Sequence, residues 1–255
     1  MAGQRIAARA AACAAVAVTA LAVTGGTAAQ ADDDIESLPA EQIADRSRDA
    51  LLDVRSLHLR AQGDLGKNRP PMTIDLSLDR SGNCAGDVDL GRNKGKAEII
   101  KRSDSVWLKP DADFWENQVP VGGSAFEAIL AGRYMKASAS DSRLRPIVQG
   151  CDLDTFRDLV SDNAGTSAGT FTKGKVTRVD GTRTVPVTRT LHGQELTAYV
   201  DTEGVHHPVR ITVRGDGADA AVDFSRFDEP VPTATPPADE TVDISAVLGR
   251  APAQS

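Results

Sequence analysis

Apolar residues alternate with polar ones in many short runs of this chain, and this alternation limits the fold more than any other feature. In residues 72–79 every second side chain is apolar, namely Met72, Ile74, Leu76 and Leu78. A period of two is typical of β-strands with one buried face and one face in water. The same pattern predicts strands in residues 54–59, 84–91, 96–102 and 104–109.

The connections between these runs are too short to hold a crossover helix, so the strands are expected to form an antiparallel meander. A second group of alternating runs follows near residues 170–179, 183–191, 195–202, 206–214 and 219–227. Dipeptides such as Asp180-Gly181 and Asp216-Gly217 separate these runs and are typical of hairpin turns. The sequence therefore predicts two antiparallel meanders.

Helices are expected before and between the two meanders. Pro39, followed by Ile43 and Leu51 near helical spacing, predicts an amphipathic helix over residues 39–53. Between residues 110 and 165, short apolar segments separated by Gly and Pro predict a helical insertion. The expected fold class is α+β, with a single domain over residues 32–248 and a disordered tail over 249–255.

The first 31 residues have the features of a cleavable signal peptide. Arg5 and Arg9 precede an apolar run of about 14 residues, shorter than the ~20 residues of a membrane-spanning helix. Ala29-Gln30-Ala31 is a small-x-small site, so we expect cleavage after Ala31, secretion, and no stable membrane anchor. Two alternatives are a lipoprotein signal that uses Cys13 and an uncleaved anchor.

Cleavage would leave an acidic protein. It would remove Arg5 and Arg9 from the 29 basic residues, so that 27 remain against 36 acidic ones, a formal charge of −9. Such a charge repels phosphate backbones and anionic headgroups, which argues against nucleic-acid binding. It does not exclude a lipid that is held by its tails.

Cys84 and Cys151 are the two cysteines that follow the predicted signal. An even number of cysteines in an exported protein predicts one disulfide. The spacing is not that of a Cys-x-x-Cys redox pair, and a structural zinc site needs about four ligands. We therefore expect a structural bridge between Cys84 and Cys151.

The sequence carries no recognisable catalytic, cofactor or metal site. It has no Gly-x-Ser-x-Gly elbow, no phosphate-binding glycine loop and no His-Glu-x-x-His motif. The four histidines lack metal-ligand spacing and are interpreted as exposed or edge residues, and the strand carboxylates as solvated. We expect a protein that is not an enzyme and needs no cofactor, with a hydrolase as the remaining alternative.

Spaced motifs over residues 38–245 resemble those of a known family. They lie in residues 43–45, 50–52, 76–86, 106–111, 114–115, 151–154, 174, 179–182 and 185–187. In these segments the chain is similar to exported actinobacterial cell-envelope proteins of the LppX/LprG type, many of them lipoproteins, and more distantly to the lipoprotein carrier LolA. One departure is that those relatives carry an acylated cysteine after the signal, whereas no cysteine stands there in this chain.

The resemblance implies a curved antiparallel half-barrel whose concave face is covered by helices, with an apolar cavity between them for acyl chains. The residues expected to line this cavity are Met72, Ile74, Leu76, Leu78, Ile129 and Leu130. Two functions follow. In the first, a secreted non-enzymatic protein binds or carries a lipid or other lipophile. In the second, the same fold with a filled core is an envelope sensor or regulatory module that binds a protein partner.

Overall fold

A computed structural model of the chain describes residues 34–65, 71–119, 121–130, 132–164, 170–191 and 193–244. The predicted signal peptide and the predicted tail after residue 248 lie outside these residues, so both stay predictions. Thirteen strands form one sheet, and five α-helices and three short 3-10 helices accompany it within the described residues. The 3-10 helices are η1 (Ile35–Ser37), η2 (Ser142–Leu144) and η3 (Ala238–Glu240).

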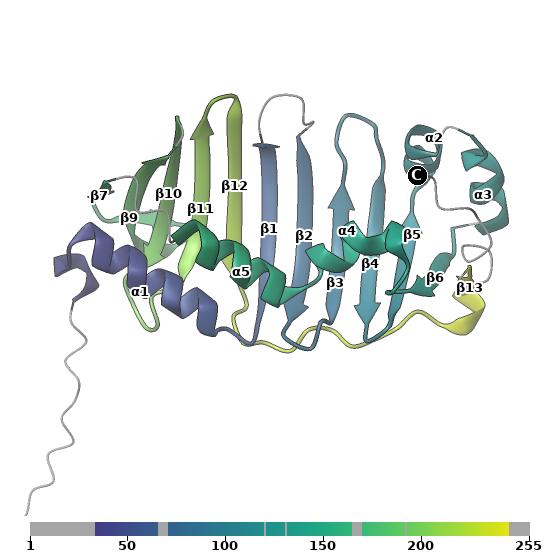
Figure 1. Ribbon diagram of the computed structural model, residues 1–255, viewed down its shortest axis with the longest axis horizontal. Helices are drawn as coiled ribbons and strands as arrows, with labels where there is room; N and C mark the ends of the chain where they lie inside the picture. The colour runs from purple at the N-terminus through teal and green to yellow at the C-terminus, as the bar shows by residue number, and fades with distance from the viewer. Residues whose placement is uncertain are drawn as a thin grey trace, which may run out of the picture. The chain divides into compact units, whose positions relative to one another are not determined.

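The first predicted meander forms half of the sheet, and each of its strands pairs antiparallel with the next (Figure 1). Its strands are β1 (Ser56–Leu65), β2 (Met72–Asp79), β3 (Cys84–Asp89), β4 (Lys96–Arg102), β5 (Ser105–Pro110) and β6 (Tyr134–Ser138). The last strand, β6, lies inside the segment that the sequence predicted as purely helical. Residue Tyr134 of β6 is buried with Ile100 and Trp107, and β6 pairs with β5. The edge of β5 therefore makes this short segment a strand.

The second meander continues the same sheet because β1 pairs antiparallel with β12. Its strands are β9 (Thr182–Leu191), β10 (Gln194–Asp201), β11 (Pro208–Gly215) and β12 (Ala218–Ser225). At the other edge of the sheet, β13 (Thr241–Asp243) pairs parallel with β6. The sheet is thus a curved open sheet that is antiparallel except at this last pair. It confirms the predicted α+β class with a curved antiparallel sheet, whereas the parallel pair was not predicted.

The predicted strand over residues 170–179 is divided into β7 (Phe171–Lys173) and β8 (Thr177–Val179), which pair with different parts of β9. Lys173 pairs with Val187, and Thr177 pairs with Thr184. Three residues of one strand therefore oppose two of the other between these pairs, and this extra residue breaks the run as a β-bulge does.

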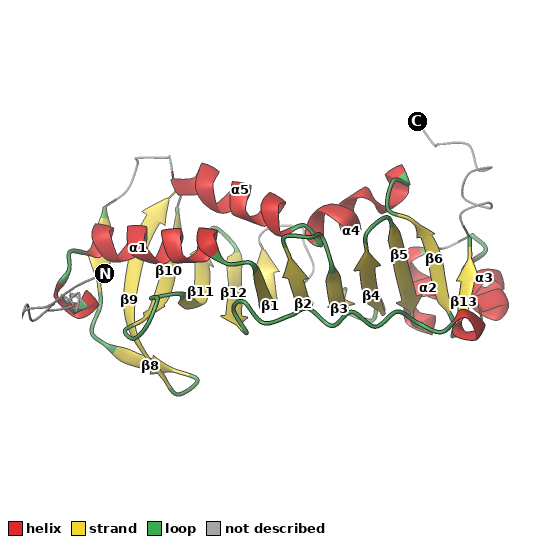
Figure 2. Cartoon of the chain, turned by 90° about the horizontal axis from the view of Figure 1, so that it is seen from below, coloured by secondary structure: helices red, strands yellow, loops and turns green. Residues whose placement is uncertain are grey.

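Three helices, α1 (Ala40–Asp53), α4 (Arg145–Gly150) and α5 (Leu153–Ala164), lie on one face of the sheet (Figure 2). We call this the helix-side face. The buried residues of α1 include Ile43, Ala50 and Leu51, which the sequence pattern had assigned to its apolar side. The remaining helices, α2 (Ala112–Gln118) and α3 (Gly123–Leu130), follow β5 and lie at the end of the sheet that holds β6 and β13 (Figure 1).

Candidate functional site

The strand register places an unbroken row of apolar side chains across the helix-side face. From β9 to β5, the members of this apolar row are Val187, Ala198, Ile211, Val222, Ala61, Ile74, Val88, Ala97 and Pro110. Because side chains alternate between the two faces of a strand, one polar residue in this register would interrupt the row. Nine consecutive strands therefore offer one continuous apolar surface.

On β2, near the middle of the sheet, burial decreases along the strand toward this row. On β2, Leu78 is 1% exposed and Leu76 is 5% exposed, whereas Ile74 and Met72 are only partly buried. Leu76 and Leu78 belong to the main hydrophobic cluster, which also holds Leu51 of α1. Strands β1, β2 and β12 extend well past α5 in Figure 1. The helices thus cover one end of these strands and leave the apolar row partly accessible.

The helices are held on this face by a covalent bond and by specific polar contacts. The predicted disulfide is present, and it joins Cys84 of β3 to Cys151, the residue directly after α4, with a Cα–Cα distance of 5.3 Å. Arg157 of α5 donates from Nε to the Leu52 carbonyl oxygen at 2.7 Å, which links α5 to the last turn of α1. These bonds fix the helices over Leu76 and Leu78 and define the border of the accessible surface.

The structure brings together four of the six predicted lining residues. Met72, Ile74, Leu76 and Leu78 share the helix-side face, as the alternation requires. Ile129 and Leu130 do not join them, because α3 follows β5 and α2 and lies at the end of the sheet, whereas β2 lies near its middle (Figure 1). Ile129 is 63% exposed, and Leu130 is buried beside a pocket that also contains Trp115.

The opposite face carries a second row of side chains, each one residue away along its strand from a member of the apolar row, and all of them are charged. From β11 to β5, this charged row consists of Arg210, Asp223, Arg60, Asp75, Asp87, Glu98 and Lys109. Three consecutive members are acidic. The pKa of Asp87 is raised first by partial burial and then by the nearby carboxylates of Glu98 and Asp75. This face is therefore unsuited to the acyl chain of a lipid.

Three hydrogen-bonded side chains on this opposite face were not predicted from the sequence. The His58 ring lies between Ser225, whose Oγ is 3.1 Å from Nδ1, and Asp75, whose Oδ1 is 2.7 Å from Nε2. The His58 side chain is only 14% exposed, so the expectation of an exposed histidine is wrong for this residue. In serine hydrolases the aspartate bonds Nδ1 and the serine bonds Nε2, the reverse of this arrangement. We interpret the contacts as cross-strand bonding of polar side chains.

Two further properties bear on the chemistry of the described residues. Their His, Cys, Asp and Glu side chains form no group of three or more that could hold a metal ion. In the same part of the chain, no helix is both long enough and apolar enough to cross a bilayer.

Comparison with known proteins identifies the fold. No family model and no curated protein matches the sequence. Among solved structures, LprF from Mycobacterium bovis is 16% identical, with 77% of this chain and 96% of that chain covered and a TM-score of 0.55. The lipoprotein LppX from Mycobacterium tuberculosis is 13% identical, with 76% and 98% covered and a TM-score of 0.47. At this identity the match to LprF concerns the fold alone, and it confirms the LppX/LprG-type fold predicted from the sequence.

Proposed function

We propose that this chain is an exported, non-enzymatic binding protein that holds a lipid or other lipophile against the helix-side face. The observation that carries the proposal is the apolar row, which is continuous over nine strands and only partly covered by α1, α4 and α5. A sheet face that served only as a core would be expected to bury Ile74 and Met72 as completely as it buries Leu76 and Leu78.

The energetics of such a site favour a long acyl chain. Each methylene that leaves water for an apolar surface contributes about 0.8 kcal/mol. The backbone of a hydrogen-bonded sheet is already ordered, so the surface is preorganised and little backbone entropy is lost on binding. Because the row crosses neighbouring strands about 4.8 Å apart, an acyl chain that lies along it would contact several strands at once.

Export is supported by two features of the chain. The first is the charged and then apolar N-terminus, for which we propose cleavage after Ala31. The second is the bond between Cys84 and Cys151, which is expected to persist in an oxidising compartment. Both features agree with a protein that works outside the cytoplasm, where lipids require a carrier to cross water.

Titration of the purified mature protein with a fluorescent fatty acid tests the proposal. Ile74→Asp places a charge in the apolar row and should weaken binding by about tenfold or more, since a charge next to an acyl chain loses its hydration. Thr73→Asp is the matched control, because Thr73 lies on the same strand, is also partly buried and faces the opposite side. This variant should bind like the parent.

Thermal melting of each variant separates loss of binding from loss of folding. If the folded parent binds neither a fatty acid nor a phospholipid, the proposal is wrong, and the protein-interaction module takes its place. Equal weakening by Thr73→Asp would contradict the assignment of the site to the helix-side face. Native mass spectrometry of protein purified from its own host would identify the bound lipophile.

A further inference from the structure

Exposed apolar side chains gather on a short segment around α3. Val121 is 90% exposed, Ile129 is 63% exposed and Phe126 is 42% exposed. The other large apolar side chains that are exposed in the described part of the chain are Val176 and Val205, which lie singly between other strands. Single exposed apolar residues are ordinary, but a group of them marks an interaction surface.

The α3 segment is anchored from its inner side. The Phe126 ring stacks on Trp115 of α2, with a centroid distance of 5.9 Å and an interplanar angle of 13°. Trp115 is 6% exposed, and Leu130 at the end of α3 is 2% exposed. The helix is therefore held to the body by Leu130 and by one face of the Phe126 ring. The exposed apolar side chains of this segment are Val121, Phe126 and Ile129, and we call them the α3 knob.

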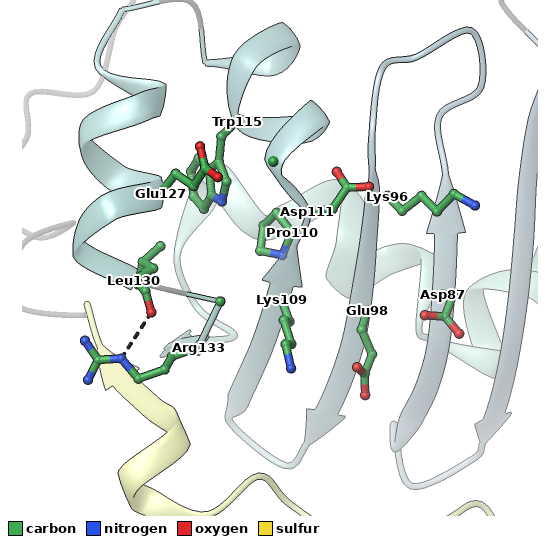
Figure 3. A pocket seen from close by; sticks show the side chains of 12 residues that line it. Asp87, Lys96, Glu98, Lys109, Pro110, Asp111, Trp115, Glu127, Leu130 and Arg133 are labelled. Atoms are coloured by element: carbon green, nitrogen blue, oxygen red, sulfur yellow. Dashed lines mark hydrogen bonds between the residues drawn. The ribbon is translucent and has the colours of Figure 1, made fainter.

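A pocket of about 400 Å³ adjoins the α3 knob, and its wall carries both signs of charge (Figure 3). The pocket is lined by four carboxylates and three cations, which are Asp87, Glu98, Asp111 and Glu127 on the one hand and Lys96, Lys109 and Arg133 on the other. The Arg133 guanidinium donates from Nε to the Leu130 carbonyl oxygen at 3.1 Å and from Nη2 to the Ile129 carbonyl oxygen at 2.9 Å. These bonds fix a positive charge next to the knob.

This combination suits one class of ligand. A zwitterionic phospholipid has a phosphate, an ammonium group and acyl chains within one molecule. The cations of the pocket suit the phosphate, its carboxylates suit the ammonium group, and the α3 knob suits the acyl region. An anionic headgroup would gain from the cations but would be repelled by the carboxylates and by the acidic protein as a whole.

We propose that the α3 knob and the adjoining pocket dock on the surface of a zwitterionic phospholipid bilayer. Val121 and Ile129 enter the acyl boundary, and the pocket takes a headgroup. A bilayer accepts an exposed apolar surface without a complementary shape, whereas a protein partner would need a matching surface. The proposal goes beyond the binding of a lipophile on the helix-side face, since it names the surface with which the protein associates.

Flotation of the mature protein with phosphatidylcholine vesicles tests the docking surface. The parent should float with the vesicles, and it should bind phosphatidylglycerol vesicles more weakly at low salt. Ile129→Asp should reduce partitioning by about tenfold, since an Ile side chain then leaves the bilayer. Val205→Asp is the matched control, because Val205 is 65% exposed on a distant turn, and it should float like the parent.

Several results would overturn the proposal. These are a parent that does not float with phosphatidylcholine, equal loss in Val205→Asp, or stronger binding to phosphatidylglycerol. If the parent sediments as a dimer and Ile129→Asp makes it a monomer, the α3 knob is covered by a second copy instead. Should Ile129→Asp fail to fold by circular dichroism, Val121→Asp replaces it. Fatty-acid titration without vesicles tests the lipophile site separately, so either proposal can fail alone.

Discussion

The two faces of the sheet carry very different rows of side chains although the same strands build both. Ile74 belongs to a row of nine apolar residues, and its neighbour Asp75 belongs to a row of seven charged residues. The first face is covered in part by helices, and the second is crossed by ion pairs such as Arg210 with Asp223. A shift of one residue in register would exchange the two faces, so burial of the apolar row determines the register.

The faces also differ in what their interactions contribute to stability. On the helix-side face the hydrophobic effect and the disulfide join sheet and helices. On the opposite face most charges are partly exposed, and ion pairs between exposed groups contribute only about 0–1 kcal/mol each. Stability should therefore respond strongly to changes in the apolar side chains of the first face and weakly to changes in the charged row of the second.

The largest effect is expected from loss of the disulfide on the helix-side face. The bond spans 67 positions of sequence, and removing it by Cys84→Ser with Cys151→Ser should lower the free energy of unfolding by about 4 kcal/mol. Urea unfolding without reductant measures the change. Ala85→Ser, the next residue on β3, faces the other side and should change stability by less than about 0.5 kcal/mol. A comparable loss in this control would show that β3 itself is the sensitive element.

A smaller but clear difference is expected within β2. Leu76 is 5% exposed in the main hydrophobic cluster and borders the accessible part of the face, so Leu76→Ala should lower the free energy of unfolding by about 2–3 kcal/mol. Ser77 points to the opposite face, and Ser77→Ala should change it by less than about 0.5 kcal/mol. Chemical denaturation of both variants and of the parent measures these free energies of unfolding. Similar losses would mean that the two faces of β2 are packed alike.

The smallest effect is expected in the charged row, where a substitution should raise the free energy of unfolding and not lower it. Partial burial, Glu98 and Asp75 raise the pKa of Asp87 in the folded protein, so its charged form is disfavoured there. This penalty is absent below the unfolded pKa of about 3.9 and is complete once the pH has risen through the folded pKa. Asp87→Asn should therefore stabilise the protein slightly at pH 7, by about 0.5 kcal/mol or less because solvent screens an exposed group.

The free energy of unfolding of the parent and of Asp87→Asn, measured at pH 7 and near pH 3 in low and in high salt, tests this prediction. The gain from Asp87→Asn should shrink at the lower pH and in high salt, since protonation and screening each remove the repulsion. A loss of stability at pH 7 would show that Asp87 makes a favourable contact that outweighs its acidic neighbours.

Local patterns predicted much of this arrangement. The helix over residues 39–53 was expected from Ile43 and Leu51, and α1 spans Ala40–Asp53. The disulfide was expected from the pairing of two cysteines in an exported chain, and it joins Cys84 to Cys151. These predictions succeeded because helical spacing, strand alternation and cysteine number are properties of short segments or of the whole composition.

Predictions that needed a partner segment were less successful. Ile129 and Leu130 have the apolar character of cavity residues, yet α3 lies at the end of the sheet, and Ile129 is 63% exposed. The run that begins at Tyr134 became β6 because β5 offered an edge with which to pair. No signal within residues 121–138 separates a core helix from an exposed one, because the difference depends on what packs against it.

The sequence alone thus determined which side chains share a face, since a period of two sorts Ile74 from Asp75 whatever the strand order. The tertiary structure decided how much of each face is covered. Pairing of β1 with β12 joined the two meanders into one sheet, and α5 crossed it without covering the whole apolar row. Alternation follows from the geometry of a single chain, whereas coverage depends on contacts between segments far apart in the sequence, which no local pattern encodes.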